Sequence, residues 1–113
     1  MAYRVPVHTS AAALPLPHYS QAVKYNGLIY CSGSIGTDPK TDELISGSVT
    51  DRTRMAIQNL SVILQEGGSS LERVLKATVY LTNMADFDAM NKAWDEFFTH
   101  DPKPVSSAGW HTP

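Results

Sequence analysis

Three polar side chains at separate places in the chain could take part in the chemistry of a small molecule. Tyr19 offers a hydroxyl on a flat ring, and Asn91 lies in a helical stretch. Ser32 follows a β-prone run and precedes Gly33, whose missing Cβ permits close backbone approach. Each also has a plain structural interpretation: a partly buried tyrosine, an exposed helix residue, and a turn after a strand. The residue types alone therefore indicate a candidate site but do not identify the reaction.

Metal, cofactor and nucleophile chemistry is not indicated. The four histidines lack ligand spacings such as His-x-x-x-His, and the glycine-rich stretches lack a phosphate-loop pattern. Cys31 is the only cysteine, so it forms no intrachain disulfide, and a reducing compartment is the simpler expectation. We interpret Cys31 as a small buried hydrophobe. We therefore expect no metal site and no phosphate-binding loop.

The candidate loop at Ser32 is held by a predicted β-hairpin. Residues 21–25 and 28–32 are β-prone, and Asn26-Gly27 between them suits a two-residue type I′ turn, since both tolerate positive φ. A further strand is expected near residues 3–8. Residues 38–42 read as a turn, which Leu44-Ile45 follows as a short strand.

Two helices and one strand follow the hairpin. Ser48 and Asp51 form a predicted capping box for a helix with an apolar stripe from Ala56 to Leu64, ended by Gly67-Gly68. Residues 75–82 alternate with period two, as in a half-buried strand. A second helix over residues 86–99 carries a heavy apolar stripe, interpreted as core packing: Phe87, Met90, Trp94, Phe97 and Phe98. This order predicts a single α+β domain with a mixed sheet and two helices on one face.

Composition limits the function classes. The chain has 113 residues, 42% hydrophobic and 18% charged, with a formal charge of −2, which fits one globular domain. The basic residues are scattered, which argues against a nucleic-acid partner, because phosphate contacts need clustered Lys and Arg. No apolar run approaches the roughly 20 residues of a membrane span. We expect a cytoplasmic or mitochondrial protein, the cytoplasm being favoured because one arginine makes a poor targeting helix.

Several segments together resemble one family, in matching order and spacing over residues 14–104. They are Tyr19-Ser20-Gln21-Ala22-Val23, Ser32-Gly33-Ser34-Ile35-Gly36, Asp38-Pro39-Lys40-Thr41, 53–64, 67–71, 76–81 and 87–98 with Asn91. This pattern is similar to that of the Rid family of imine deaminases, also known as the L-PSP endoribonuclease or YjgF-like family. The residues in the middle of the chain resemble the fungal branch of this family most.

The resemblance implies a chorismate-mutase-like fold and a homotrimer with clefts between subunits. It also implies hydrolysis of 2-imino acids, such as 2-iminobutanoate and 2-iminopropanoate, to 2-oxo acids and ammonia without a cofactor. In these clefts Tyr19, Ser32, Gly33 and Asn91 would bind the substrate.

The chain departs from the family pattern after Pro104. Ser106 stands where the resemblance places an arginine that binds the substrate carboxylate, and residues 105–113 read as an atypical tail. We expect the family's last strand to be missing, together with an acidic residue that would help to activate water. Because Val105-Ser106 can be encoded GTG-AGT, which resembles an intron donor, the tail could derive from an unspliced intron.

Three functions follow. The first is an imine deaminase, impaired by the missing arginine. The second is a non-catalytic trimeric module of the same fold that binds a ligand or partner, which Ser106 favours. The third, a ribonuclease or translation inhibitor, fits the negative charge least. The catalytic residues themselves cannot be assigned from the sequence.

Overall fold

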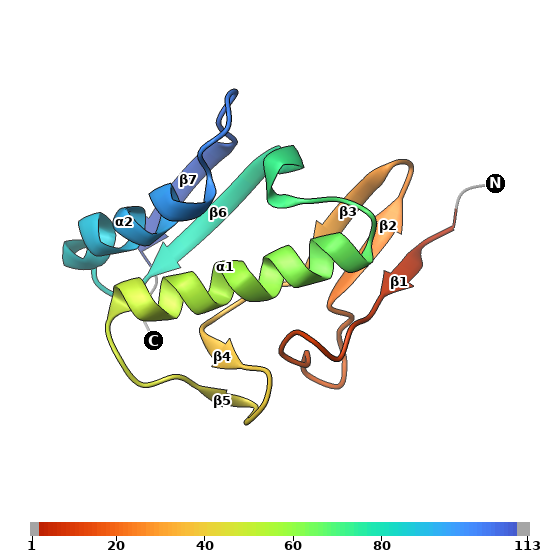
Figure 1. Ribbon diagram of the computed structural model, residues 1–113, viewed down its shortest axis with the longest axis horizontal. Coiled ribbons are helices and arrows are strands. Elements are labelled where there is room, and N and C mark those ends of the chain that lie inside the picture. Colours follow the sequence, from red (N-terminus) through yellow and green to blue (C-terminus); the bar gives the residue numbers. More distant parts are fainter. Residues whose placement is uncertain (1–2, 111–113) are drawn as a thin grey trace.

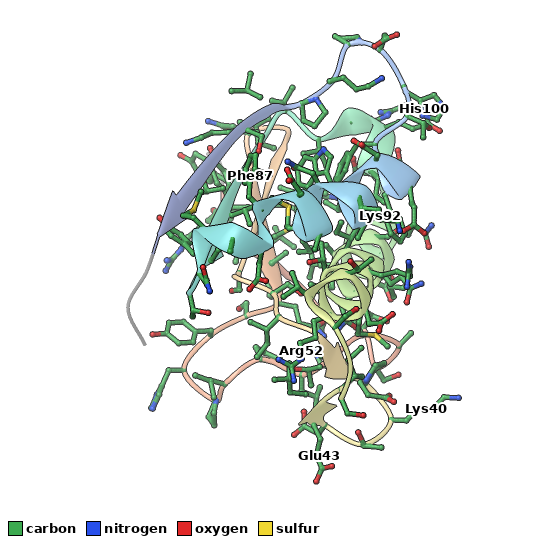
Figure 2. The ribbon with its side chains drawn as sticks, turned by 90° about the vertical axis from the view of Figure 1, so that its left-hand side faces the viewer. Lys40, Glu43, Arg52, Phe87, Lys92 and His100 are labelled. Atoms are coloured by element: carbon green, nitrogen blue, oxygen red, sulfur yellow. The ribbon has the colours of Figure 1, made fainter. Side chains whose placement is uncertain are left out.

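The computed structural model describes residues 3–110, with the backbone alone for 107–110. In chain order the elements are β1 (Val5–Val7), β2 (Ala22–Tyr25), β3 (Leu28–Cys31), β4 (Thr37–Asp38), β5 (Glu43–Leu44), α1 (Val49–Glu66), η1 (Leu71–Arg73), β6 (Lys76–Leu81), η2 (Met84–Asp86), α2 (Phe87–Phe97) and β7 (Val105–Trp110). Figures 1 and 2 show a layer of helices, α1 and α2, against one face of a layer of strands. The predicted α+β class with two helices on one face is confirmed.

The predicted hairpin is present, with its turn at the expected dipeptide. β1, β2 and β3 form an antiparallel sheet in that order, and Tyr25 pairs with Leu28 across the turn. Asn26 has φ 50° and Gly27 has φ 79°, the positive values that a type I′ turn requires. Local sequence therefore sets the register of β2 against β3.

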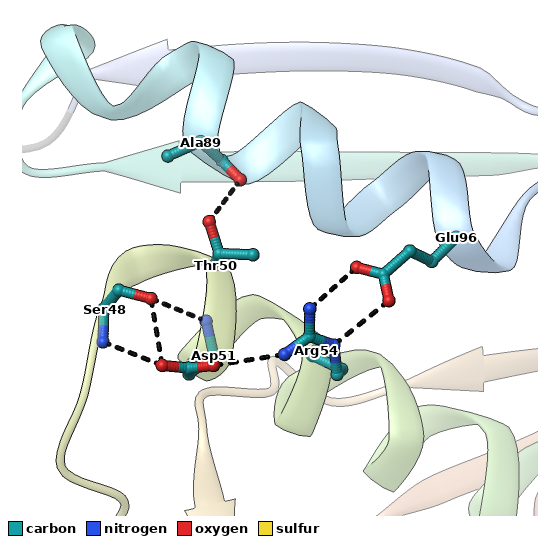
Figure 3. Close-up of polar contacts among 6 residues, drawn as sticks. All are labelled: Ser48, Thr50, Asp51, Arg54, Ala89 and Glu96. Carbon is teal, nitrogen blue, oxygen red and sulfur yellow. Dashed lines mark hydrogen bonds and ion pairs between the residues drawn. The ribbon is translucent and has the colours of Figure 1, made fainter.

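The capping box predicted for α1 is also present. The Asp51 amide donates to Ser48 Oγ at 3.2 Å, and the Ser48 amide donates to Asp51 Oδ2 at 3.2 Å (Figure 3). The helix ends at Gly67, and Gly68 follows with φ 87°. Two first-turn donors thus have partners, as the start of a helix needs.

The apolar stripe of α2 mostly packs into the core, as predicted. Met90 and Phe98 are buried, and the rings of Trp94 and Phe98 stack with centroids 4.1 Å apart. Figure 3 shows the polar contacts that tie α2 to α1: Thr50 Oγ1 donates to the Ala89 carbonyl at 3.0 Å, and Arg54 forks onto Glu96. These contacts join the two helices into one layer.

The strands do not form one continuous sheet. Among the described residues, β1-β2-β3 form one sheet, β4-β5 a second, and β6-β7 a third in which the strands are parallel. Residues 105–110, the first part of the tail that departs from the family pattern, form β7 and pair with Lys76–Leu81. Residues 111–113 lie outside the described residues. That a family strand is missing stays a prediction.

The single chain exposes more surface than a compact monomer. Its accessible surface is 7857 Å² for 12.4 kDa, whereas a compact monomer of this mass exposes about 6,100 Å². The radius of gyration is 14.1 Å, against about 13.3 Å for a compact domain of this length. The single chain is therefore less compact than an average monomer of its mass.

Candidate functional site

The candidate loop begins at Ser32, which joins it to the segment that carries Tyr19. The Ser32 amide donates to the Gln21 carbonyl at 3.0 Å, and its hydroxyl donates to the Ser20 carbonyl at 2.5 Å. Tyr19 is the residue before Ser20. The structure thus brings the predicted residues Tyr19, Ser32 and Gly33 to one place in the chain.

Gly33 leaves its surroundings open. A Cβ at Gly33 would meet no atom within 4 Å, so the backbone there is accessible from outside. Three residues later, a Cβ at Gly36 would lie 2.8 Å from the Cα and the carbonyl oxygen of Arg52. The loop is therefore open at one end and pressed against α1 at the other.

Hydrogen bonds fix the loop on α1. Ser34 Oγ donates to the Ala56 carbonyl at 3.0 Å, and the Ile45 amide donates to the Gly36 carbonyl at 2.8 Å. Arg52 Nε donates to the Ile45 carbonyl at 3.2 Å. The loop geometry is thus set before any ligand arrives, which lowers the cost of binding one.

Two buried amides, which the sequence analysis missed, position the chain before Tyr19. Gln21 Oε1 accepts from the Thr9 amide at 2.7 Å, and its Nε2 donates to the carbonyls of Thr9 and Ala13, both at 3.0 Å. Asn59 Oδ1 accepts from the Ala13 amide at 3.1 Å. The signal for Asn59 is present in the sequence, since an amide falls within the apolar stripe of α1 at a position that faces the core.

Tyr19 itself is an exposed side chain. It is 64% exposed, and its amide closes a turn by donating to the Leu16 carbonyl at 3.0 Å. The alternative of a partly buried tyrosine is wrong for the single chain. Its ring is available to a ligand or to a neighbouring subunit.

The other predicted residues lie on different elements. Asn91 is half-buried on α2, and Ser106 is exposed on β7, where it pairs with Ala77 of β6. Within the described part of the chain, no hydrogen bond joins Asn91 or Ser106 to Tyr19, Ser32 or Gly33. Of the four predicted substrate-binding residues, three lie near one another in one chain, and Asn91 lies apart from them on α2.

Cys31 is not the buried hydrophobe that we expected. The residue is exposed, although desolvation by the protein atoms around its thiol raises its pKa. A raised pKa leaves less thiolate at neutral pH, so it does not favour a nucleophilic role. Cys31 pairs with Ala22, which is only 2% exposed, so the same face of the sheet is covered at β2 and open at β3.

The face of β1-β2-β3 that points away from the helices is apolar. Ile29 packs on the core, so its neighbours Leu28 and Tyr30 point to the opposite side, where they are 43% and 56% exposed. Val23 pairs with Tyr30, and Tyr25 pairs with Leu28, which extends this surface. Contiguous exposed apolar patches of this kind mark interaction surfaces.

A hollow in the surface lies elsewhere. A groove of about 530 Å³ runs along α1 beside the β4-β5 hairpin, and Lys40, Met55, Gln58 and Phe97 line part of it. None of the predicted site residues lines it. Residues 3–110 also hold no cluster of three potential metal ligands and no helix suited to crossing a bilayer.

Comparison with known proteins identifies the family. The family model described as endoribonuclease L-PSP matches residues 9–109. The RutC family protein PH0854 of Pyrococcus horikoshii is 41% identical over 102 residues, which cover 90% of this chain and 80% of that protein. The mitochondrial protein mmf1 of Schizosaccharomyces pombe is 40% identical over 107 residues, covering 95% and 64%.

Two further similarities bear on fold and chemistry. A protein of Dermatophagoides farinae named 2-iminobutanoate/2-iminopropanoate deaminase is 33% identical over 101 residues, covering 89% of this chain and 78% of that protein. The crystal structure of RidA from an Antarctic Psychrobacter superposes with a TM-score of 0.87 at 33% identity, covering 93% and 84%. The fold is therefore the chorismate-mutase-like fold, and this chain belongs to the Rid family.

Proposed function

We propose that this chain binds 2-imino and 2-oxo acids in clefts between the subunits of a homotrimer, and that its hydrolysis of 2-iminobutanoate and 2-iminopropanoate is impaired. The trimer is supported by the apolar outer face of β1-β2-β3 and by the separation of Tyr19 and Asn91 on different elements. The substrate class is supported by the name of the Dermatophagoides relative.

Hydrolysis of a 2-imino acid makes three demands on a site. The carboxylate must be held, a water must be directed at the imine carbon, and the leaving nitrogen must receive a proton. In our proposal the open backbone at Gly33 and the Ser32 hydroxyl line the cleft, while Tyr19 and Asn91 contact the substrate from neighbouring subunits. We assign no catalytic acid or base.

Ser106 is the observation on which the impairment rests. It is an exposed serine on β7, at the position where the family resemblance implies an arginine. A bidentate, charge-assisted contact between arginine and carboxylate contributes on the order of 1.5–3 kcal/mol. Its loss corresponds to roughly tenfold to hundredfold weaker binding. A serine hydroxyl supplies at most one neutral hydrogen bond.

Ammonia release tests the proposal. 2-Iminobutanoate is generated enzymatically in the presence of either this chain or the Dermatophagoides deaminase, at equal subunit concentration. We expect this chain to release ammonia at least about tenfold more slowly. Equal turnover would refute the impairment, and the absence of any 2-oxobutanoate binding in calorimetry would refute the ligand class.

A non-catalytic module is the second candidate, and Ser106 favours it too. Such a module would bind 2-oxobutanoate without accelerating imine hydrolysis over the uncatalysed rate. Ribonuclease activity finds less support, because the formal charge is −2 and the basic residues are scattered. For location, the name of the fission-yeast relative supports the mitochondrial option over the cytoplasmic one.

A further inference from the structure

The turn between β2 and β3 is a dipeptide in which the chain can react with itself. Attack of the Gly27 backbone nitrogen on the side-chain carbon Cγ of Asn26 would close a five-membered ring. Because glycine has no Cβ, its nitrogen is less hindered than that of any other residue at this position. Asn26 is the only asparagine of the chain that precedes a glycine. The fold places this dipeptide at the tip of the β2-β3 hairpin (Figure 1).

The structure leaves the reacting groups of the dipeptide free. Asn26 and Gly27 are both exposed. Within residues 3–110, no hydrogen bond holds the Asn26 side chain or the Gly27 amide, and the pairing of the hairpin ends at Tyr25 and Leu28. A Cβ at Gly27 would meet no atom within 4 Å, so the space beside its backbone is open. The hairpin therefore holds the turn in place without covering it.

The other asparagines of the chain are restrained. Asn59 is buried, and its side chain bonds two backbone groups at 3.1 and 2.8 Å. Asn83 Oδ1 accepts from the Ala85 amide at 2.9 Å. Asn91 lies inside α2, where the amide that follows it donates within the helix. Only Asn26 combines a free side chain, a free following amide and a glycine.

We propose that Asn26 is a site of spontaneous deamidation in the folded protein, and that the isoaspartyl product disrupts the turn between β2 and β3. The deprotonated Gly27 nitrogen forms a bond to Asn26 Cγ, the Cγ–Nδ2 bond breaks, and ammonia leaves with the proton that the amide lost. Water then opens the cyclic imide at one of its two carbonyls. Opening at one carbonyl gives aspartate, and opening at the other gives isoaspartate.

The two products differ in their effect on the backbone. Isoaspartate runs the main chain through its Cβ and Cγ, which adds one CH₂ group between positions 26 and 27. The present turn matches the strands because both of its residues have positive φ, 50° and 79°. A longer main chain loses this match, so the pairing of Tyr25 with Leu28 weakens. Aspartate leaves the chain length unchanged, and Asp-Gly suits the same turn.

Peptide mapping of the intact protein tests where the reaction occurs. After incubation at mildly alkaline pH, mass spectrometry should find deamidation at Asn26 and none at Asn59, Asn83 or Asn91. The rate should rise with pH, because the attacking nitrogen must lose its proton. Gly27→Ala should slow the reaction at least about tenfold, since the added Cβ hinders that nitrogen. Equal rates in Gly27→Ala and wild type would overturn the proposal.

The unfolded chain is the second comparison, because alanine at a positive φ can also loosen the turn. In guanidinium, Asn26 should react no more than about tenfold faster than in the folded protein, since the fold leaves its reacting groups uncovered. An unreacted Asn26 in the folded protein, with reaction in the unfolded chain, would show that the hairpin protects it and would overturn the proposal.

A charge-matched variant tests the effect of the product. The isoaspartyl form is separated by ion exchange and compared with Asn26→Asp, which has the same charge and a normal backbone. Amides of β2 and β3 should exchange hydrogen at least about tenfold faster in the isoaspartyl form. Equal exchange in both would contradict disruption of the turn. No imine is present in these experiments, so their outcome is independent of the proposed function.

Discussion

Gln21 and Asn59 hold the backbone of Ala13 from two sides. Gln21 Nε2 donates to the Ala13 carbonyl at 3.0 Å, and Asn59 Oδ1 accepts from the Ala13 amide at 3.1 Å. Both amides are nearly inaccessible, at 3% and 4% exposure, and their polar atoms have partners. This contact fixes the irregular segment that leads to Tyr19.

Asn59→Ala should destabilise the fold by about 1–3 kcal/mol. The substitution leaves the half-buried Ala13 amide and the Thr37 carbonyl, which Asn59 Nδ2 contacts at 2.8 Å, without their side-chain partner. Urea denaturation measures the change. Gln58→Ala, next to it on the exposed side of α1, is the matched control and should change stability by less than about 0.5 kcal/mol. Equal effects would show that the contact does not stabilise the fold.

Alanine at the two loop glycines should separate folding from ligand binding. A Cβ at Gly36 would press on the Arg52 backbone at 2.8 Å, so Gly36→Ala should cost about 1–3 kcal/mol of stability. Gly33→Ala meets no atom and should fold normally, while weakening 2-oxobutanoate binding in calorimetry. Tight binding by Gly33→Ala would argue against close approach of a ligand at this position.

Low pH should remove the contribution of the Arg54–Glu96 ion pair to the stability of the fold. The hydrogen bond from Arg54 lowers the pKa of Glu96 below its ordinary value of 4.5. A depressed carboxyl pKa contributes stability that is complete above pH 4.5 and is lost as the pH falls through the lower folded-state value. The stability difference between wild type and Glu96→Gln should therefore shrink below pH 4.5.

The control for that experiment is Asp95→Asn, at an exposed neighbouring position. Its difference from wild type should stay small at every pH. Because the Arg54–Glu96 pair is exposed, its contribution should also fall in high salt. A constant difference for Glu96→Gln from pH 3 to pH 7 would contradict the assignment.

The apolar outer face of β1-β2-β3 should carry the contact between subunits. Tyr30→Glu places a charge in the middle of that face, so light scattering should show a smaller particle than for wild type at the same concentration. Leu14→Glu, at a comparably exposed site in the loop before β2, should leave the particle unchanged. Unaltered size in Tyr30→Glu would move the interface elsewhere.

Elements set by nearby residues were predictable from sequence. The turn at Asn26-Gly27 depends on two residues, and the capping box on Ser48 and Asp51, three positions apart. The interactions that stabilise the turn and the capping box involve only neighbouring residues. The residue types at those positions were therefore enough to predict both features.

Features set by distant contacts were not predictable. Ala13 and Asn59 are 46 residues apart, so nothing near Asn59 reveals its partner. β7 contains two serines and a glycine, which are weak strand formers, yet it pairs along all of β6.

Restoring the arginine is the most direct test of the central claim, that the site lacks only its carboxylate clamp for tight binding. Ser106→Arg should bind 2-oxobutanoate about tenfold to a hundredfold more tightly than wild type. Val105→Arg adds the same charge on the opposite face of β7 and should have no effect. Wild-type binding as tight as that of Ser106→Arg, or equal gains in both variants, would contradict the account.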